Sequence, residues 1–350
     1  MVYGLRKYFP REFEVEVAAG VGDGRLERKI RDLGIRYHHV PHLVREVKPL
    51  YDILALFELM RLMKENKYDV VHLHSSKAAA LGRIAAKLAG VKKVVYTIHG
   101  FWGIEQYKGW KRYTVVCAEK LLSKLTDRIV LLCERDLEKA KRYGIGNPRQ
   151  YVIIPNTVIL EHKPIPGSLR KELGIPENVK IVGNIARLDK PKNPLRFLRI
   201  ASEILKVRDD VVFVWIGGAV VNDGTKREVE EFLERETLLR EKVYFMDFRE
   251  DATKFLGDFD VFLLTSDSEG MPLVVLEALK AGVPVISTDV GCVREMIGEN
   301  SVSSSEERLV EMLLERLDQP KRAEAKITSY EDFINYEDFI NLYERLFRSL

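Results

Sequence analysis

The sequence Val261-Phe-Leu-Leu-Thr-Ser-Asp-Ser-Glu-Gly-Met-Pro-Leu-Val-Val-Leu-Glu-Ala-Leu-Lys-Ala-Gly-Val-Pro-Val-Ile-Ser287 decides the fold. It begins and ends with apolar runs, Val261–Leu264 and Val283–Ser287, which are typical of strands buried on both faces. Between them, Pro272 suits the first turn of a helix, which we expect over Pro272–Ala281. A strand, a helix and a second strand of this kind form the repeating unit of a parallel α/β sheet.

The same alternation of short apolar runs and longer helical patterns continues along the chain. We expect further strands over Phe13–Ala18, Tyr68–Leu73, Lys93–Ile98, Arg128–Leu132, Tyr151–Ile154, Lys180–Ile185, Val211–Ile216 and Val243–Phe245. We expect further helices over Asp52–Lys64, Ala78–Ala89, Val115–Lys124, Pro194–Lys206, Thr225–Leu239, Ala252–Leu256, Glu306–Leu317 and Tyr330–Phe347. The last helix contains the hexapeptide YEDFIN twice, at 330–335 and 336–341, and we assign it no chemical role. The pattern predicts doubly wound α/β domains.

The chain of 350 residues is long enough for two domains. The alternation pauses at Asn156–Pro176, which contains three prolines and is the best candidate for a linker. We therefore expect one Rossmann-like domain over residues 1–157 and a second over 158–328. A C-terminal helix over 329–350 could pack back on the first domain. Ligands of such sheets bind beyond the C-terminal ends of the strands, so two facing domains would enclose a cleft.

The net charge of +3 conceals a basic half and an acidic half. Residues 1–157 carry 29 Lys and Arg against 17 Asp and Glu, a net charge of +12, and residues 158–350 carry the opposite balance of −9. This asymmetry points to an anionic partner for the first half, either nucleic acid or a membrane surface. No apolar stretch approaches the 18 residues of a membrane-spanning helix, and Met1–Lys7 lacks the core of a signal peptide, so we expect a cytoplasmic protein.

Two acidic residues of the second domain stand out. Glu269 and Gly270 precede the helix at Pro272, where exposed N–H groups and the helix dipole favour an anion. Glu277 lies about a turn and a half inside that otherwise apolar helix, so we expect its carboxylate to face a polar ligand or partner. Carboxylates bind sugar hydroxyl groups well. The alternative is an ion pair with Lys280, three residues further on.

A basic segment, Gly183–Pro194, also follows a strand and precedes a helix. Arg187 and Lys192, with Lys190 nearby, could clamp a diphosphate. The alternative is a solvated basic loop. Cations that suit phosphate and carboxylates that suit hydroxyl groups would then lie at strand ends of the same domain.

This combination resembles the GT-B glycosyltransferases of family 4, which are retaining enzymes that use nucleotide sugars. The likeness is carried by Glu269 and Glu277 with the continuation through Gly291, by Gly183, Arg187 and Lys192, by Ile154–Asn156, and by Tyr96–Gly100. The segment His72–Lys77 is similar to members that build bacterial-type surface polysaccharides. The resemblance extends over nearly the whole chain from Phe13 onward.

The resemblance implies two Rossmann-like domains facing a cleft, and a hexosyltransferase. The enzyme would move a sugar from a UDP- or GDP-sugar to a glycan or polyprenyl-linked acceptor in surface polysaccharide synthesis. It would need no cofactor and no metal ion.

The resemblance also assigns roles to individual residues. Glu277 would hold the donor ribose, while Arg187 and Lys192 would neutralise the diphosphate leaving group. Glu269 would contact the donor sugar, and His99 would lie near the reacting carbon. The expected donor-binding residues are Gly183, Arg187, Lys192, Glu269, Gly270, Met271, Leu273 and Glu277, and the expected catalytic residues are His99, Glu269, Arg187 and Lys192.

The basic first half is the expected acceptor side. His72, His74 and Lys77 are candidates for acceptor binding, against the alternative of a structural role. The segment Trp102–Arg112 interleaves aromatic and basic side chains, notably Trp102, Trp110, Lys111 and Arg112. This mixture suits anionic lipid at the inner face of the membrane. The same residues could stack on RNA, but no nucleic-acid module is visible, and we expect no nucleic-acid partner.

Two departures from the family pattern keep other functions open. The family's first strand and Gly-rich turn have no counterpart ahead of Phe13–Ala18, and the chain is expected to run from Gly298 into the Glu306 helix without the family's usual strand. The alternatives are a GT-B-fold epimerase that converts the nucleotide sugar without an acceptor, and a truncated, inactive remnant that binds nucleotide.

Overall fold

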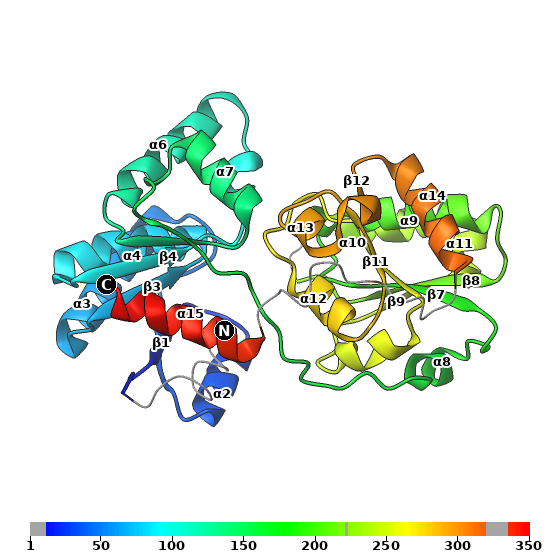
Figure 1. The fold of residues 1–350 in the computed structure, drawn as a ribbon, viewed down its shortest axis with the longest axis horizontal. Coiled ribbons are helices and arrows are strands. Elements are labelled where there is room, and N and C mark those ends of the chain that lie inside the picture. Colours follow the sequence, from blue (N-terminus) through cyan, green and yellow to red (C-terminus); the bar gives the residue numbers. More distant parts are fainter. Residues whose placement is uncertain (1–11, 221–222, 320–334) are drawn as a thin grey trace. The chain divides into compact units, whose positions relative to one another are not determined.

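The chain folds into two compact units of alternating strands and helices (Figure 1). The computed structural model describes residues 12–220, 223–319 and 335–350. The first unit comprises residues 1–157 and 334–350, and the second comprises residues 158–333. All strand pairs in the described residues are parallel, which confirms the predicted α/β architecture.

The strands of the first unit form two separate parallel sheets. β1 (Glu16–Ala19) pairs with β2 (Arg36–His39), and α2 (Arg25–Asp32) connects them. The second sheet has the order β3-β4-β5-β6, with β3 (Val70–His74), β4 (Lys93–Thr97), β5 (Arg128–Leu131) and β6 (Tyr151–Ile153). A hydrogen bond between the Tyr68 hydroxyl and the Glu16 carboxylate links the two sheets.

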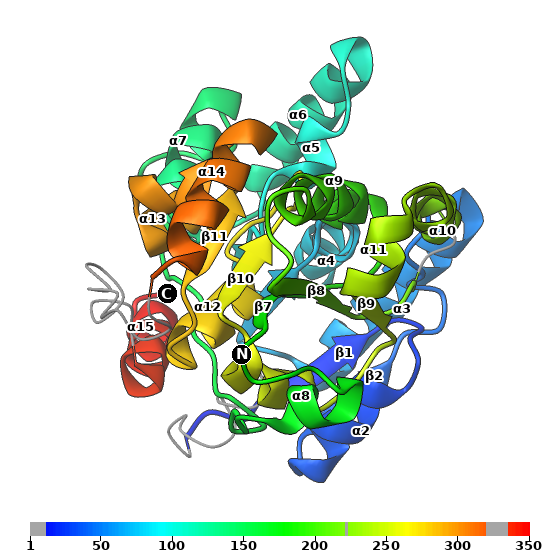
Figure 2. The same cartoon turned by 90° about the vertical axis from the view of Figure 1, so that its right-hand side faces the viewer.

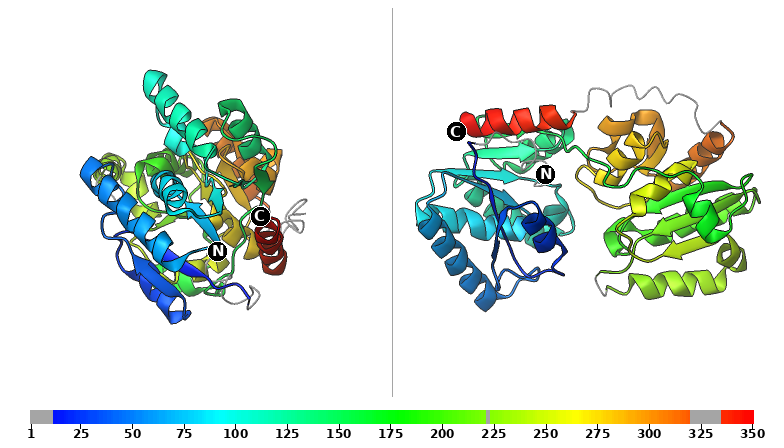
Figure 3. Two further views of the ribbon diagram at one scale, coloured as in Figure 1. Left: turned by 90° about the vertical axis from the view of Figure 1, so that its left-hand side faces the viewer. Right: turned by 90° about the horizontal axis from the view of Figure 1, so that it is seen from below.

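Helices cover both faces of the four-stranded sheet. Val94 packs with α3 (Pro49–Asn66) and α4 (Ser76–Ala89), and Tyr96 packs with α4 and α6 (Gly109–Ser123). Val95 points to the opposite face, where it contacts the C-terminal helix α15 (Tyr336–Arg348). Figure 3 shows α15 and α3 on opposite sides of the sheet. The period-two alternation of a strand therefore divides the core of this unit into two layers.

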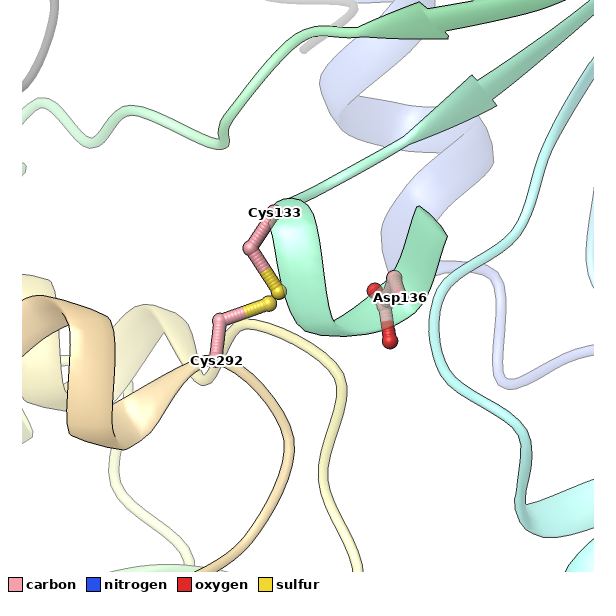
Figure 4. A group of neighbouring side chains, drawn as sticks. All are labelled: Cys133, Asp136 and Cys292. Carbon is pink, nitrogen blue, oxygen red and sulfur yellow. The ribbon is translucent and has the colours of Figure 1, made fainter. Parts of the chain in front are cut away.

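Two shorter helices complete the first unit. α5 (Trp102–Glu105) follows β4, and α7 (Glu134–Tyr143) follows β5. Cys133 occupies the N-cap position of α7, and Asp136 is buried in its first turn (Figure 4). Both helices lie at the C-terminal ends of strands, as a doubly wound unit requires.

The second unit contains one six-stranded parallel sheet in the order β12-β11-β10-β7-β8-β9. Figure 2 shows β11, β10, β7, β8 and β9 of this sheet. Its strands are β7 (Lys180–Ile185), β8 (Val211–Ile216), β9 (Val243–Met246), β10 (Val261–Leu264), β11 (Val285–Thr288) and β12 (Val302–Ser303). In chain order this is the 3-2-1-4-5-6 arrangement of a Rossmann fold. The direction of winding reverses between β7 and β10, and ligands of this fold bind at that point.

The second unit has seven helices in its described residues. They are α8 (Ser168–Leu173), α9 (Pro194–Leu205), α10 (Thr225–Arg235), α11 (Thr237–Lys242), α12 (Leu273–Lys280), α13 (Val293–Ile297) and α14 (Glu306–Leu317), with 3₁₀ turns at Lys190–Lys192, Ala252–Asp258 and Glu299–Ser301. Of these helices, α9, α10, α11 and α14 share one continuous apolar core with the sheet. All six residues of β8 are buried, and Phe197 of α9 packs edge-to-face against Phe213 and Trp215. This core fixes the strand ends that carry the candidate site.

The structure corrects three details of the sequence-based expectations. The single helix expected over Thr225–Leu239 is two helices, because Glu236 has an extended backbone and Arg240 donates a hydrogen bond to the freed carbonyl of Leu233. The short strand β12 pairs with β11 in the region where we expected no strand. Of the repeated hexapeptide, the second copy begins α15, and all but Asn335 of the first copy lies outside the described residues.

Candidate functional site

Two loops of the second unit meet at the point where its strand order reverses. The first follows β7 and carries Arg187 and Lys192, and the second follows β10 and carries Glu269. β7 and β10 are hydrogen-bonded neighbours, so their C-terminal ends bring the two loops together. The geometry unites residues that are nearly 80 positions apart in sequence.

Backbone and side-chain hydrogen bonds tie these loops to each other. The N–H of Asp267 donates to the carbonyl of Pro191 at 2.8 Å, and the Thr265 hydroxyl donates to the carbonyls of Lys192 and Asn193 at 3.2 Å. Asn193 has a left-handed backbone (φ 48°), and its side-chain amide donates to both oxygens of Asp267. The loops therefore form a single preorganised edge.

Lys192 and Glu269 form the central ion pair of this edge. The Lys192 Nζ lies 2.6 Å from Glu269 Oε1, and the Ser266 hydroxyl donates to the same oxygen at 2.6 Å. Both charged side chains are largely buried. A ligand with a phosphate for Lys192 and hydroxyl groups for Glu269 could replace this pair without leaving either charge unpaired.

Arg187 is more exposed and pairs with a buried acid. Its guanidinium lies 3.0 Å from Asp189 Oδ2, and the Asp189 side chain is only 4% exposed. Burial raises the pKa of Asp189, while the nearby Arg187 and Lys192 lower it. Asp189 thus holds the Arg187 guanidinium by its side chain, and its carbonyl accepts a hydrogen bond from the N–H of Lys192 at 3.1 Å. The loop therefore carries two cations, which suits an anion with more than one charge.

Glu277 lies inside α12, where no described residue provides a partner for its carboxylate. It makes no side-chain hydrogen bond or ion pair with any described residue. Burial, with a smaller contribution from Glu161, raises its pKa to about 7. The alternative pairing with Lys280 is wrong, because the Lys280 ammonium donates instead to the carbonyl of Val158 at 2.9 Å. A carboxyl group in this setting is available to the hydroxyl groups of a ligand.

Two glycines of the site lie where there is no room for a Cβ atom. A Cβ on Gly291 (φ 50°) would come within 2.0 Å of the Gly270 carbonyl oxygen, which accepts a hydrogen bond from the N–H of Cys292 at 2.8 Å. Gly183 lies inside β7, where a Cβ would collide with the Phe259 ring at 2.2 Å, so the structure gives it a packing role. Its donor-binding role stays a prediction.

The start of α12 supplies the remaining residues expected in the donor site. Pro272 occupies the N-cap position and Leu273 begins the helix, with half of its surface exposed. Met271 is buried beside them. The first N–H groups of α12 therefore lie next to Glu269 and Gly270, as the sequence pattern predicts.

The first unit contains a cluster of histidines on adjacent strands. His74 Nδ1 of β3 lies 2.9 Å from Nε2 of His99, which follows β4. His72 Nε2 lies 2.7 Å from the Thr97 hydroxyl, and the His72 and His74 rings are 4.3 Å apart. Burial lowers the pKa of all three imidazoles, that of His74 to about 3. Burial thus favours the neutral form of each imidazole, and the expected catalytic His99 shares a hydrogen bond with His74.

The structure gives Lys77 a structural role in the same unit. Its ammonium donates to the carbonyl of Val44 at 2.8 Å and to that of Glu46, and it pairs with Asp52 Oδ1 at 2.5 Å. These bonds fix the chain that leads into α3. Its role in acceptor binding stays a prediction.

The aromatic and basic segment of the first unit is largely exposed. Trp110 is 72% exposed at the start of α6, Trp102 is 40% exposed, and the Lys111 ammonium lies 5.9 Å from the Trp110 ring centre. Arg112 instead donates to the carbonyls of Tyr107 and Glu105. Across the described ranges, none of the helices has the length and hydrophobicity needed to cross a bilayer.

Sequence reasoning missed the residues that hold the site in shape. Arg196 of α9 donates to the Thr265 carbonyl at 3.0 Å and pairs with Asp267 and Glu306. Asp189 and Ser266 orient Arg187 and Glu269 in the same way. The short spacings of Arg187 and Asp189 and of Ser266 and Glu269 are local signals, whereas the contacts of Arg196 join residues distant in sequence.

Known proteins match both units of the chain. The model of the glycosyl transferase 4-like domain matches residues 2–157, and the model of the glycosyl transferases group 1 family matches residues 167–336. UDP-Gal:alpha-D-GlcNAc-diphosphoundecaprenol alpha-1,3-galactosyltransferase of Escherichia coli is 36% identical over 271 residues, which cover 74% of this chain and 67% of that protein.

More distant relatives extend the likeness to the whole chain. N,N'-diacetylbacillosaminyl-diphospho-undecaprenol alpha-1,3-N-acetylgalactosaminyltransferase of Campylobacter jejuni is 24% identical, with coverage of 96% of this chain and 92% of that one. The crystal structure of Anabaena Alr3699/HepE in complex with UDP-glucose superimposes with a TM-score of 0.81 at 18% identity, covering all of this chain and 94% of the other. That structural likeness shows the fold, which is GT-B. The chain belongs to the glycosyl transferases group 1 family and is a glycosyltransferase.

Proposed function

We propose that this glycosyltransferase moves a hexose, with retention of anomeric configuration, from a UDP-sugar to a polyprenyl diphosphate-linked acceptor in surface polysaccharide synthesis. The observation that carries the proposal is the edge where β7 and β10 end, which brings Arg187 and Lys192 together with Glu269. The name of the Escherichia coli relative supports the donor and the acceptor class.

The proposed donor orientation follows from the charges of the site. The diphosphate lies against Arg187 and Lys192, the ribose hydroxyl groups donate to Glu277, and the sugar hydroxyl groups meet Glu269. The N–H groups at the start of α12 support the phosphate or the sugar. The diphosphate and the sugar then replace the ion pair between Lys192 and Glu269, and the ribose provides the partner that the Glu277 carboxylate lacks among the described residues.

The proposed reaction needs no protein nucleophile and no metal ion. The bond between the anomeric carbon and the diphosphate oxygen breaks, and the acceptor oxygen bonds to the same face of that carbon. The acceptor proton passes to the leaving phosphate, whose developing charge Arg187 and Lys192 stabilise. His99 is proposed to lie near the reacting carbon as a neutral hydrogen-bonding group, because burial lowers the pKa of its imidazole.

A transfer assay tests this function directly. UDP- and GDP-hexoses are incubated with a polyprenyl diphosphate sugar, with and without a chelator, and the products are separated. The proposal expects transfer from a UDP-sugar that the chelator leaves unchanged. An epimerised donor formed without acceptor would support the epimerase instead, and nucleotide binding without any turnover would support an inactive remnant.

We also propose that the segment Trp102–Arg112 contacts anionic lipid at the inner face of the membrane, where such an acceptor is held. The exposed Trp110 beside Lys111 supports this contact. Binding to anionic vesicles should fall as the salt concentration rises. Equal binding to neutral vesicles, or no binding to either, would contradict it.

A further inference from the structure

The outward side of α3 carries an apolar surface that nothing in the described first unit covers. Leu50, Ile53, Leu54 and Phe57 lie three, four and seven positions apart, a spacing that places them on one side of a helix. They are 76%, 52%, 45% and 56% exposed. We call these four residues the α3 face. Single exposed apolar residues are ordinary, but four large ones on two consecutive turns mark an interaction surface.

The opposite side of α3 is firmly held, so the exposure of the α3 face does not come from loose packing. Ala55, Leu59 and Met63 are buried in the layer between α3 and α4. Glu58 pairs with His42 Nδ1 at 2.5 Å, and Asp52 pairs with the Lys77 ammonium. The two acidic side chains in the first three turns of α3 thus form ion pairs away from the α3 face, and the α3 face itself is apolar.

Basic residues flank the α3 face at both ends. Arg45 and Lys48 are exposed just before the helix, and Arg61 and Lys64 are exposed on the turns that follow Phe57. An apolar helix face bordered by lysine and arginine is typical of a helix that lies in the headgroup region of a membrane. α3 packs on α4, which also contacts α6, the helix that carries Trp110.

Charge distinguishes a membrane from a second copy of the chain as the occupant of this surface. Residues 1–157 carry a net charge of +12, so two copies meeting at this unit would repel each other. An anionic lipid surface instead attracts the same charges. The charge balance therefore favours lipid.

We propose that the α3 face inserts among the lipids of an anionic membrane and holds the enzyme at the surface. This inference rests on the membrane contact proposed above and deepens it. Leu50, Ile53, Leu54 and Phe57 enter the boundary between headgroups and acyl chains, while Arg45, Lys48, Arg61 and Lys64 remain at headgroup level.

Co-sedimentation with vesicles of phosphatidylethanolamine and phosphatidylglycerol in equal parts tests the proposal. The triple variant Leu50→Ser, Ile53→Ser and Phe57→Ser removes apolar surface that is already exposed, so its unfolding temperature should stay close to that of the wild type. We expect its vesicle partition coefficient to fall about tenfold or more. The matched control, Val207→Ser with Leu238→Ser, removes exposed apolar residues of the second unit and should bind as the wild type does.

A depth probe and a hydrodynamic measurement complete the test. An environment-sensitive fluorophore attached to Leu54→Cys, with the free Cys117 replaced by Ser, should shift to the blue on adding these vesicles. Unchanged partition of the triple variant, or no shift of the fluorophore, would overturn the proposal. A change in sedimentation velocity that shows loss of a dimer would assign the face to a second copy and overturn it as well.

The failure of this inference can be told apart from that of the proposed function. Transfer to a water-soluble acceptor analogue should be equal in the triple variant and the wild type. If the triple variant binds vesicles normally while Trp110→Ser with Lys111→Ser does not, the α3 proposal fails and the contact at Trp102–Arg112 stands. Absence of transfer in the wild type would count against the proposed function alone.

Discussion

At the scale of single residues, the carboxyl group of Glu277 lies in a place that is unfavourable for a negative charge. Its pKa of about 7 lies above the ordinary 4.5, because burial penalises the ionised form. A folded state that holds its proton to higher pH than the unfolded state loses stability as the pH rises from about 4.5 to about 7. The residue therefore costs free energy at neutral pH that a bound ribose can recover.

This argument predicts a pH-dependent stabilisation by Glu277→Gln. The amide removes the cost of ionisation, which is on the order of 3 kcal/mol from the shift in pKa. The variant should raise the unfolding temperature more at pH 8 than at pH 5, as measured by circular dichroism. Glu241→Gln, on the surface of α11, is the control. An increase of equal size at both pH values would show that ionisation of Glu277 is not the cause.

Substitution of Glu269 should have different effects on the binding of UDP and on the turnover of the UDP-sugar. Glu269→Gln breaks the ion pair with Lys192 and frees that cation for the diphosphate, so UDP should bind as tightly as in the wild type or more tightly. Turnover of the UDP-sugar should fall on the order of 10²-fold, because the sugar loses a charged partner. Calorimetry with UDP and initial rates with UDP-sugar measure the two effects. Loss of UDP affinity would place Glu269 on the nucleotide instead.

The imidazole of His74 should stay neutral throughout the physiological range. Burial, and the neighbouring His99, lower the pKa of His74 to about 3. Ring ¹⁵N chemical shifts should therefore show a neutral imidazole for His74 from pH 8 down to pH 5. A titration near pH 6.5 would contradict the buried, hydrogen-bonded arrangement of His74 and His99.

At the scale of elements, the loop between β10 and α12 depends on the close approach of Gly291. Gly291→Ala places a Cβ against the carbonyls of Glu269 and Gly270, whereas Gly282→Ala meets nothing within 4 Å. Both glycines have positive φ, so both substitutions carry the same kind of backbone strain, about 1 kcal/mol or more.

We expect both alanine variants to lose some thermal stability, and only Gly291→Ala to lose most of the donor turnover as well. The reason is that Glu269 must move when its carbonyl is displaced. Melting curves and the kcat/KM for donor give the comparison. If Gly282→Ala impairs turnover as much as Gly291→Ala does, general strain and not the loop position is responsible.

The elements differ in how far sequence could predict them. The bounds of β7, β8, β10 and α14 agree with the apolar runs, because a buried parallel strand or an amphipathic helix has a strong local pattern. α7, α8 and the division between α10 and α11 were not predicted. The first is mostly polar, the second has only six residues, and the division depends on Arg240 reaching back to the preceding turn.

The side-chain geometry could be predicted only in part. Strand ends placed Arg187, Lys192 and Glu269 in one domain, since parallel strands present their C-terminal ends at one edge. The engagement of Lys77 with Val44, Glu46 and Asp52, and of Lys280 with Val158, could not be read from spacing. Long flexible side chains select partners from the folded surface, and those partners are tens of residues away.

At the scale of the whole molecule, our proposals relate the charge asymmetry to a division of tasks. The second unit has a net negative charge, yet Arg187 and Lys192 lie at the point where its strand order reverses. The first unit carries the basic surplus together with the exposed apolar side of α3 and the exposed Trp110. In our proposals the second unit binds the donor, and the first binds the acceptor at a lipid surface.

Isothermal titration of the full chain with UDP and with GDP tests the central claim most directly. We predict that the wild type binds UDP, that Glu277→Ala and Arg187→Ala each weaken binding about tenfold or more, and that Lys226→Ala, on the exposed side of α10, does not. The account would be contradicted if the wild type bound neither nucleotide, or if Glu277→Ala and Arg187→Ala bound UDP as tightly as the wild type.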